Sequence, residues 1–477
     1  MINAQVAAVL LAAGASTRFG RPKQLLPWHG RPLIAHVLDT AWITGFDPRI
    51  VVLGAEAHRI RPAIADRDAI VMHNHRWAEG MSTSIALGLA ALPPETEAAV
   101  FLPVDQPLIN PNLLRALVEA WERGAGTLVV PRSTNGRRGS PVLFDRAHFE
   151  ALSRLSGDIG GRALFESHTE AIAYMTVPDP VVLTDVDTPE AFAALQARSQ
   201  DFDRTLDFST IEGVISDMDG VLWRGDEPLP GLHDLFSLLH DRDLPYVLVT
   251  NNSSHTPEEY ADRLRGMGIR TTADHVLNSA EAAATYVATR SPGARVYAMG
   301  GSGVRHALSE HGLSVTQAND TERADYVVVG WDRELTWQKL ATATRLIHDG
   351  AVFVGTNPDR TFPMEAALAP GNGMQLAALE ATTDVKPVVV GKPEPLLYKQ
   401  AMDRMGTSPD TTLMIGDRLD TDILGAAQLG MPTALTLTGI SGEDGLQRSP
   451  IRPTAVYEDL PALIEAWRTA LKRPVTA

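Results

Sequence analysis

The sequence predicts an α/β protein of two modules, each built on a sheet of mostly parallel strands. Short apolar runs of strand length alternate along the chain with longer segments of helical periodicity. Continuous apolar strands between helices are typical of parallel sheets covered on both faces. Several runs end directly in Gly, Asp, Asn or Thr, at the strand ends where ligands of open α/β sheets bind. The predicted strands are Val6–Leu11, Ile50–Leu53, Ala98–Val104, Leu128–Val130, Val181–Leu183, Val214–Ser216, Tyr246–Val249, Tyr326–Val329, Val388–Val390 and Leu413–Ile415.

Composition excludes several classes of function. The net charge is −16, so we expect no basic face for a phosphate backbone and no nucleic-acid partner. There are no cysteines, which excludes disulfides, thiolate nucleophiles and cysteine-bound metals. No apolar run approaches the length that spans a bilayer, and the first residues lack the basic region of a signal peptide. The sequence therefore predicts a cytoplasmic protein without a membrane partner.

The 477 residues are too many for one ordinary core, and a polar stretch without clear periodicity divides them. This stretch, residues 198–212, follows a short Ala-rich helix predicted at 189–197. A new strand begins at Val214 and opens a second strand–loop–helix series. We therefore predict a first domain at 1–197, a linker at 198–212 and a second α/β module with a possible insertion.

The first module opens with a small-residue loop between a strand and a helix-like segment. Small residues let the backbone approach a triphosphate closely, with amide groups pointing inward. Two cations of the loop add fixed positive charge for the β- and γ-phosphates of a nucleotide. The alternative is a Gly/Ala-rich turn with two solvated cations. The candidate nucleotide-binding residues of this loop are Leu11, Ala12, Ala13, Gly14, Arg18 and Lys23.

Two aspartates of the first module are candidate metal ligands. Asp105 follows the predicted strand Ala98–Val104, and Asp187 stands in the stretch Thr184–Glu190. Two carboxylates suffice for Mg²⁺ at a nucleotide site, because the ion keeps waters and phosphate oxygens as its other ligands. Either aspartate is alternatively a turn or helix-capping residue, and for Asp187 alone the cap is the favoured interpretation.

Residues 5 to about 197 resemble the nucleotidyltransferases related to molybdenum-cofactor cytidylyltransferase. The resemblance runs in order through LAAGASTRFGRPKQLLPW, NHRWAEGMSTSIALGLAAL, DQP, GSPVLF, SGDIGGRALF and DVDTPEAF. It implies that Gly14 and the neighbouring backbone bind phosphates, and that Lys23 stabilises the pentavalent phosphorus. It also implies that Asp105 and Asp187 hold Mg²⁺, that Ser82 and Ser84 lie near the nucleotide, and that the Ala-Ala-Gly form favours CTP as co-substrate.

The second module places chemistry-bearing side chains after four apolar runs. Asp217 and Asp219 leave the end of one strand together, because alternate strand residues point the same way. Each group alone has a simpler explanation as an Asn-rich cap, a surface lysine or a solvated turn, but four in order favour a phosphoryl-transfer site. The later groups are Thr250, Asn251 and Asn252, then Lys392, then Asp417 and Asp422.

This set resembles the haloacid dehalogenase superfamily, in particular its NagD-like phosphatases, over residues 211–470. The resemblance implies that Asp217 is the nucleophile, that Asp219 is the general acid and base and supplies a backbone ligand to Mg²⁺, and that Asp417 completes the metal site. It further implies that Thr250 and Lys392 hold the phosphoryl group, with Asn251 and Asn252 beside it, and that Asp422 orients the metal shell. The hydrolase core then comprises 213–281 and 389–470, and 282–388 forms an α/β cap whose loop Thr356–Asp359 faces the core.

The sequence thus predicts a bifunctional enzyme, a Mg²⁺-dependent, CTP-using nucleotidyltransferase fused to a Mg²⁺-dependent phosphatase. Its expected partners are small phosphate esters and a nucleoside triphosphate, and the second resemblance allows a homodimer. Two alternatives stay open. One is a nucleotide-sugar or polyol-phosphate cytidylyltransferase paired with its phosphatase. The other is a nucleotide-sensing regulatory protein with a phosphatase effector domain.

Overall fold

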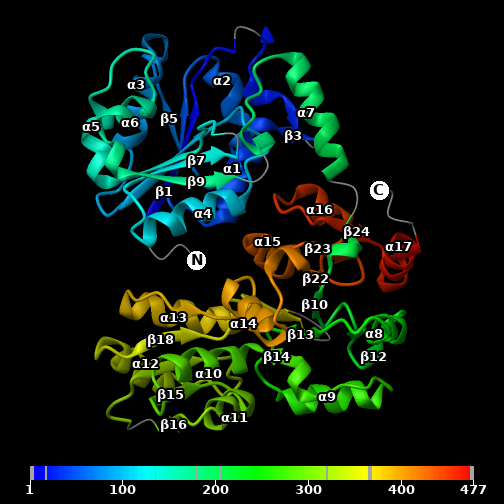
Figure 1. The fold of residues 1–477 in the computed structure, drawn as a ribbon. Helices are drawn as coiled ribbons and strands as arrows, with labels where there is room; N and C mark the ends of the chain where they lie inside the picture. The colour runs from blue at the N-terminus through cyan, green and yellow to red at the C-terminus, as the bar shows by residue number, and fades with distance from the viewer. Residues whose placement is uncertain are drawn as a thin grey trace. The chain divides into compact units, whose positions relative to one another are not determined.

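The computed structural model describes residues 5–16, 19–28, 30–134, 136–177, 180–202, 206–318, 321–363 and 368–472. The chain divides into two compact units, unit 1 (Met1–Arg204) and unit 2 (Thr205–Ala477) (Figure 1). Each unit is built on open α/β sheets, which confirms the predicted fold class.

Unit 1 contains a seven-stranded sheet in the order β5-β4-β1-β6-β8-β7-β9. Neighbours pair in parallel except β8, which runs antiparallel to both β6 and β7. β8 departs from the expected parallel arrangement because a short hairpin, not a helical crossover, joins it to β7. The strands are β1 (Val6–Ala12), β4 (Arg49–Leu53), β5 (Ile70–His73), β6 (Ala98–Pro103), β7 (Leu128–Ser133), β8 (Val142–Asp145) and β9 (Ile172–Val177).

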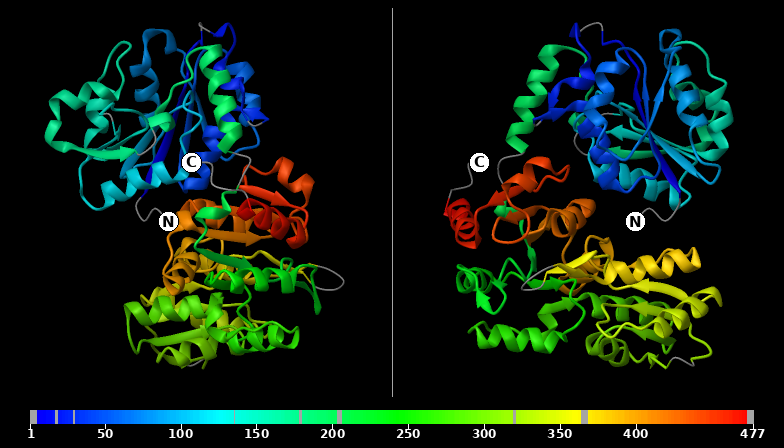
Figure 2. Two further views of the ribbon diagram at one scale, coloured as in Figure 1. Left: turned by 45° about the vertical axis from the view of Figure 1, so that its right-hand side comes forward. Right: turned by 180° about the vertical axis from the view of Figure 1, so that it is seen from behind.

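Helices cover both faces of this sheet, as the two views of Figure 2 show. Alternate residues of β1 enter the two layers, since Leu10 packs in one buried cluster and Val9 in the other. The Leu10 layer contains α1 (Leu33–Thr44), α4 (Pro111–Glu122) and α7 (Pro189–Phe202), and the Val9 layer contains α3 (Met81–Ala90), α5 (Phe149–Ser153) and α6 (Leu164–Ser167). The remaining short helix is α2 (Ala57–Ile60).

Two expectations for the end of unit 1 are corrected. The run Val181–Leu183 is not a strand but part of a short 3-10 helix, Pro180–Leu183. Its Leu183 packs into the core without pairing to the sheet, whose edge is already occupied by β9. The helix predicted at 189–197 is α7, which continues to Phe202 into the stretch expected as linker. Its first turn receives a cap from the Thr188 hydroxyl, which accepts from the amide of Ala191 at 3.2 Å.

Unit 2 contains a core sheet of six parallel strands in the order β14-β13-β10-β22-β23-β24. The strands are β10 (Gly213–Asp217), β13 (Tyr246–Thr250), β14 (Val276–Asn278), β22 (Thr412–Gly416), β23 (Thr433–Thr436) and β24 (Ala455–Tyr457). Its helices are α8 (Leu232–Asp241), α9 (Pro257–Gly266), α14 (Pro395–Met405), α15 (Leu424–Leu429), α16 (Glu443–Arg448) and α17 (Leu460–Lys472).

A second parallel sheet of five strands, order β16-β15-β17-β18-β21, forms the cap of unit 2. The last strand, β21, carries the chain to Lys392 and pairs with β18, so Lys392 follows a strand of the cap sheet. The strands are β15 (Arg295–Met299), β16 (Ser314–Thr316), β17 (Tyr326–Val329), β18 (Val352–Gly355) and β21 (Val388–Val389). The cap helices are α10 (Ser279–Arg290), α11 (Ser302–Glu310), α12 (Trp337–His348) and α13 (Asn372–Thr383).

Cap and core share one hydrophobic cluster. It contains Ile215 and Val249 of the core sheet, Val296 and Val354 of the cap sheet, and side chains of α10 and α14. Burial of this apolar surface holds the cap against the core. Two small hairpins complete unit 2, β11 (Trp223–Arg224) with β12 (Glu227–Pro228) and β19 (Thr361–Pro363) with β20 (Leu368–Pro370).

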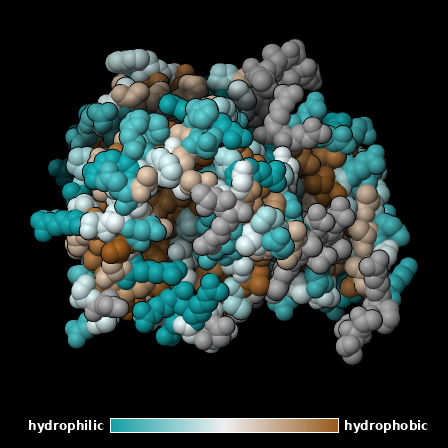
Figure 3. All heavy atoms as spheres, turned by 90° about the horizontal axis from the view of Figure 1, so that it is seen from above, coloured by the Kyte–Doolittle hydropathy of each residue, from teal (hydrophilic) through white to brown (hydrophobic). Residues whose placement is uncertain are grey.

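The surface is predominantly hydrophilic on the face shown in Figure 3, where hydrophobic residues lie in separate patches. Among the residues that the structure describes, no helix combines the length and apolarity needed to cross a membrane.

Candidate functional sites

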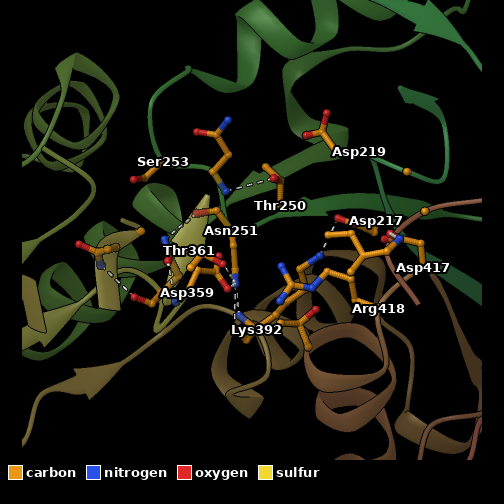
Figure 4. A pocket seen from close by; sticks show the side chains of 18 of the residues that line it. Asp217, Asp219, Thr250, Asn251, Ser253, Asp359, Thr361, Lys392, Asp417 and Arg418 are labelled. Atoms are coloured by element: carbon orange, nitrogen blue, oxygen red, sulfur yellow. Dashed lines mark hydrogen bonds and ion pairs between the residues drawn. The ribbon is translucent and has the colours of Figure 1, made fainter. Parts of the chain in front are cut away.

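The larger cavity, about 980 Å³, lies in unit 2 at the carboxyl ends of the core strands. Asp217 ends β10, Thr250 ends β13, and Asp417 directly follows β22. Because these strands are parallel neighbours, their ends meet at one edge of the sheet. All three residues line the cavity, together with Lys392, which follows the cap strand β21 (Figure 4).

A lysine between two carboxylates forms the centre of this site. Lys392 Nζ lies 2.6 Å from Asp217 Oδ1 and 2.7 Å from Asp422 Oδ1. All three side chains are buried. Burial alone lowers the pKa of Lys392, but Asp217 and Asp422 outweigh it and raise that pKa above its ordinary value. Lys392 is therefore a permanent cation in the cavity.

Asp417 has the surroundings of a cation ligand. Its Oδ2 accepts a hydrogen bond from the amide of Ile440 at 2.7 Å, whereas its buried Oδ1 has no hydrogen-bond partner among the described residues. Oxygen atoms of Asp217, Asp417 and Asp422 lie within 4.8 Å of one another. Burial and then the charges of Asp217 and Asp422 raise the pKa of Asp417 to about 8. A divalent cation would satisfy Oδ1 and offset this repulsion, so the donor set fits Mg²⁺.

Two glycines leave room for the Asp417 carboxylate. A Cβ on Gly439 would lie 1.8 Å from Asp417 Oδ2, and one on Gly220 would lie 2.6 Å from the same atom. Gly220 also has φ +88°, a conformation that other residues adopt at a cost. The backbone therefore packs directly against the carboxylate, which keeps it in place.

Asp422 is held behind the cavity by the backbone that follows β22. Its Oδ2 accepts from the amides of Asp417 and Arg418 at 3.2 and 3.1 Å. Burial raises its pKa to about 6, while Lys392 opposes the shift. Asp422 thus ties Lys392 to the Asp417 loop, a geometry consistent with the predicted orienting role.

Asp219 lies at the exposed side of the cavity. Its Oδ1 accepts from the indole Nε1 of Trp223 at 2.7 Å. The side chain points away from the Lys392 cluster in Figure 4. Trp223, which the sequence interpretation did not single out, thus holds the predicted acid–base group at the solvent side of the cavity.

The three residues of the predicted phosphate-binding loop make different contacts. Thr250 Oγ1 is buried and accepts from the amide of Asn252 at 3.1 Å. The Asn251 side chain instead binds the backbone of Lys392 and donates to the carboxylate of Asp359 at 3.2 and 3.3 Å. Asn252 lines the cavity and accepts from the amide of Ser254 at 3.0 Å.

The cap loop after β18 reaches the core loop and closes one side of the cavity. Asn357 donates to the backbone carbonyl of Asn251 at 2.8 Å, and both Asn357 and Asp359 line the cavity. Burial raises the pKa of Asp359, against the opposing charge of Arg418. Arg418 also lines the cavity and was missed from sequence, since it pairs locally with Asp420 like an ordinary surface arginine.

A second cavity, about 520 Å³, lies in unit 1 beside the end of β1. The structure brings most of the predicted nucleotide-site residues together here. The lining includes Leu11, Ala13, Gly14, Lys23, Ser84, Asp105 and Asp187. Lys23 forms an ion pair with Asp105, and Asp187 Oδ1 lies 3.9 Å from Lys23 Nζ. The carboxylates of the two aspartates form a donor set that suits Mg²⁺ together with phosphate oxygens.

Two predicted residues, Ala12 and Ser82, do not line this cavity, and Ser84 lines it with its hydroxyl already bonded. Ala12 is buried in the Leu10 layer of the core. Ser82 is buried and donates to the carbonyl of Gly157 at 2.7 Å, so its hydroxyl supports the cavity from behind. Ser84 accepts from Asn74 at 2.9 Å. Arg18 lies outside the described residues.

Two residues of unit 1 were missed from sequence. Gln24 is buried and donates to the carbonyls of Ala12 and Gly14 at 2.9 and 3.1 Å, which fixes the small-residue loop. Asp185 lines the cavity and accepts from Gln106 at 2.7 Å, and burial raises its pKa. The signal available in the sequence was the position of Asp185, which lies two residues before the predicted metal ligand Asp187 in the same loop.

Comparison with protein families matches each unit separately. Residues 8–172 match the family described as MobA-like NTP transferase domain. Residues 214–314 match haloacid dehalogenase-like hydrolase, and residues 389–463 match a second HAD-hydrolase-like family. Both resemblances predicted from the motifs are thereby confirmed.

Similar proteins include acid sugar phosphatases. That of Staphylococcus saprophyticus is 39% identical over 254 residues, 53% of this chain and 97% of the relative. That of Staphylococcus aureus is 40% identical over 249 residues, 52% of this chain and 95% of the relative.

Similar solved structures include two nitrophenyl phosphatases. The p-nitrophenyl phosphatase from Archaeoglobus fulgidus has 31% identity and a TM-score of 0.51, covering 54% of this chain and 99% of that chain. The 4-nitrophenylphosphatase from Thermotoga maritima has 30% identity and a TM-score of 0.52, covering 55% and 99%.

Proposed function

This chain belongs to the haloacid dehalogenase-like hydrolases of the NagD-like kind in its second half and carries a MobA-like NTP transferase domain in its first, and from this premise we propose a bifunctional enzyme. The proposed activity of the first half is that of a Mg²⁺-dependent, CTP-using nucleotidyltransferase. The proposed activity of the second half is that of a Mg²⁺-dependent sugar- or polyol-phosphate phosphatase. Nucleotidyltransferase and phosphatase are the two enzyme classes of its domains. The metal, the nucleotide and the substrates are the proposed part.

The phosphatase proposal rests on the convergence of Asp217, Lys392 and Asp417 in one cavity. The Asp217 carboxylate attacks the phosphorus of the ester, and the bond from phosphorus to the leaving oxygen breaks. Lys392, in contact with Asp217, balances the negative charge that the phosphoryl oxygens bring. Thr250 holds one of those oxygens through its hydroxyl.

Asp219 carries the protons of the two half-reactions. It protonates the leaving oxygen as Asp217 becomes aspartyl-phosphate, then takes a proton from the water that hydrolyses this intermediate. Inorganic phosphate leaves and both carboxylates return to their starting state. The side chain turns from Trp223 toward the phosphoryl group for these transfers.

Asp217 and Asp417 would hold the magnesium ion, with Asp422 orienting the surrounding groups. The magnesium ion would supply positive charge that lowers the repulsion between the nucleophile and the phosphoryl oxygens. The unpartnered Oδ1 of Asp417 supports this assignment.

Polar groups beyond the phosphoryl site support a hydroxyl-rich substrate. Asn357, Asp359 and Thr361 from the cap line the cavity, and Trp331 adds an indole ring. Amide and carboxylate groups pair with sugar or polyol hydroxyls, and a ring packs against the carbon face of such a molecule. The relatives named acid sugar phosphatases favour the same class.

The transferase proposal rests on Lys23, Asp105 and Asp187 meeting beside the small-residue loop. A phosphate oxygen of the acceptor attacks the α-phosphorus of CTP, and pyrophosphate leaves. The loop around Gly14 aligns the triphosphate, and Lys23 stabilises the charge of the pentavalent phosphorus. Asp105 and Asp187 would hold Mg²⁺. Molybdopterin and polyol phosphates are the acceptor classes favoured by the resemblance.

The decisive test combines two measurements on the full chain. Thermal melts with Mg²⁺ and each of CTP, GTP, ATP and UTP test the nucleotide, and release of phosphate from a panel of sugar and polyol phosphates tests the hydrolase. We expect a selective shift with CTP and turnover that EDTA abolishes. Equal shifts with all four nucleotides would refute CTP selectivity, and hydrolysis unaffected by EDTA would refute Mg²⁺ dependence.

A nucleotide-sensing protein with a phosphatase effector is the alternative. It predicts that CTP changes the hydrolysis rate without being consumed. Pyrophosphate release from CTP with any acceptor of the panel would favour the transferase over this alternative.

A further inference from the structure

The hairpin that joins β7 to β8 in unit 1 concentrates positive charge. From Arg123 to Phe144 the sequence has four arginines and no acidic residue, although the whole chain carries a net charge of −16. Two of these arginines, Arg132 and Arg138, face each other across the hairpin as bridge partners. Both side chains therefore lie on the same side of the hairpin.

Both guanidinium groups lie over one aromatic ring. The Arg132 Cζ is 4.7 Å from the centroid of Tyr174, and the Arg138 Cζ is 5.3 Å from it. Tyr174 is half-buried and packs against the buried cluster of the Val9 layer, which holds its ring in place. The ring thus forms a rigid platform that brings the two cations together.

Neither guanidinium is paired with an acidic side chain of the residues that the structure describes. Within the described ranges, the side chains of Arg132 and Arg138 form no ion pair and no hydrogen bond. Two like charges on one ring repel each other, and an oxyanion between them would remove this repulsion. Planar guanidinium groups match the geometry of phosphate and bind it through pairs of hydrogen bonds.

The hairpin borders the nucleotide cavity. Ser140, at its far end, and Val142 and Phe144 of β8 line that cavity. Arg137 Nη2 lies 3.9 Å from Asp185 Oδ2, and Asp185 also lines the cavity. Tyr174 shares the same buried layer as Val142 and Phe144, so the arginine pair continues the sheet face that forms the cavity floor.

We propose that Arg132 and Arg138, supported by Tyr174, form a binding site for a phosphate-class oxyanion, and that its occupant is an anionic group of the nucleotidyl acceptor. The site as such follows from the geometry, whereas the identity of its occupant rests on the proposed transferase function. The triphosphate of CTP has its own partners at Gly14 and Lys23, which leaves this second anion site for the other substrate.

The test uses methylphosphonate, a dianion that no phosphatase can hydrolyse, on the full-length chain. Hydrogen–deuterium exchange of peptides spanning residues 128–145 is followed as methylphosphonate is added in the presence of Mg²⁺ and CTP. We expect protection of the hairpin, with an apparent dissociation constant that rises about tenfold or more in R132Q/R138Q, because two charge-assisted contacts are lost. Arg123→Gln, which changes an exposed arginine paired with Glu119, is the matched control and should change the constant by less than about twofold.

The outcomes separate the site from its occupant. Protection confined to peptides around Lys392, or equal hairpin protection in R132Q/R138Q, would overturn the site. A CTP-induced melting shift that disappears in R132Q/R138Q would assign the pair to the triphosphate and overturn the acceptor assignment. Absence of any CTP shift in the unmodified chain would instead count against the proposed transferase, and hairpin protection would still establish the oxyanion site.

Discussion

The Asn251 side-chain amide forms a closed pair of hydrogen bonds with the backbone of Lys392. Nδ2 donates to the Lys392 carbonyl at 2.8 Å, and Oδ1 accepts from the Lys392 amide at 2.8 Å. The same Nδ2 reaches Asp359 of the cap loop. One residue of the core therefore contacts both Lys392 and the cap loop.

Replacing Asn251 should slow the phosphatase. We expect Asn251→Ala to lower kcat by about 10- to 100-fold, the size of effect found when groups that orient a reactive site are removed. The measurement is steady-state release of phosphate at saturating substrate. The control is Asn110→Ala, which removes the cap of α4 in unit 1 and should leave kcat unchanged. An unchanged kcat in Asn251→Ala would show that Lys392 is positioned without this pair.

Replacing the nucleophile should abolish turnover without unfolding unit 2. We expect Asp217→Asn to lower kcat by roughly a thousandfold or more, while Lys392 keeps its contact with Asp422. Acid quenching during turnover should trap a phosphoryl group on the unmodified protein and none on this variant. Asp234→Asn, an exposed aspartate paired with Arg468, is the control. Labelling that persists in Asp217→Asn would place the nucleophile elsewhere.

Metal-free protein should lose stability as pH rises from about 6 to 8. The pKa of Asp417 is about 8 and that of Asp422 about 6, both above the ordinary value of 3.8. Each group binds more protons in the folded than in the unfolded state between about pH 4 and its raised pKa, so the free energy of unfolding falls with increasing pH over that range. Asp422 contributes up to about pH 6 and Asp417 up to about pH 8, above which the decline levels off. Melts in EDTA should show a lower Tm for unit 2 at pH 8 than at pH 6.

Magnesium and one substitution provide the checks on this pH dependence. Mg²⁺ should raise the Tm more at pH 8 than at pH 6, because at pH 8 fewer protons must leave the site. Asp417→Asn should flatten the decline in EDTA, since the residue can no longer titrate. Each kcal/mol corresponds to roughly 2–4 °C for a unit of this size. The same slope in Asp417→Asn and the unmodified chain would contradict the assignment.

Lys23 should control nucleotide binding. It is the only lysine of residues 1–204. CTP with Mg²⁺ at a hundred times its dissociation constant should stabilise unit 1 by about 2.7 kcal/mol, and Lys23→Ala should remove most of this shift. Arg61→Ala, an exposed cation of the same unit, should retain it. Asp217→Asn should also retain it, because that residue belongs to unit 2.

Gly439 should tolerate no side chain. A Cβ there would lie 1.8 Å from Asp417 Oδ2 and 2.3 Å from its Cγ, so Gly439→Ala must displace the carboxylate. We expect loss of Mg²⁺-induced stabilisation and of phosphatase activity. Gly445→Ala is the matched control: nothing lies within 4 Å of its Cβ, and alanine should favour helix α16 by roughly 0.5–1 kcal/mol. Full activity in Gly439→Ala would show that Asp417 has room to move.

Sequence reasoning succeeded where the signal is local. An apolar run of strand length followed by a carboxylate predicted the strand and a side chain that lines the cavity at its end, as at Asp217 and Asp417. The structure brings the ends of β10, β13 and β22 together because neighbouring parallel strands end at the same edge of a sheet. It failed at Val181–Leu183, since a short apolar run can bury its side chains in a 3-10 helix as well as in a strand.

The sequence by itself determined the α/β class, the two domain families and many, though not all, of the residues that line each cavity. Only the tertiary structure decided how those residues are held: β21 joins the cap sheet, Asn251 pairs with Lys392, and Arg132 and Arg138 share the ring of Tyr174. The physical reason is the separation along the sequence of the residues that interact. Strand and helix periodicity arises between residues a few positions apart, whereas Asn251 and Lys392 are 141 positions apart and meet only when both sheets have formed.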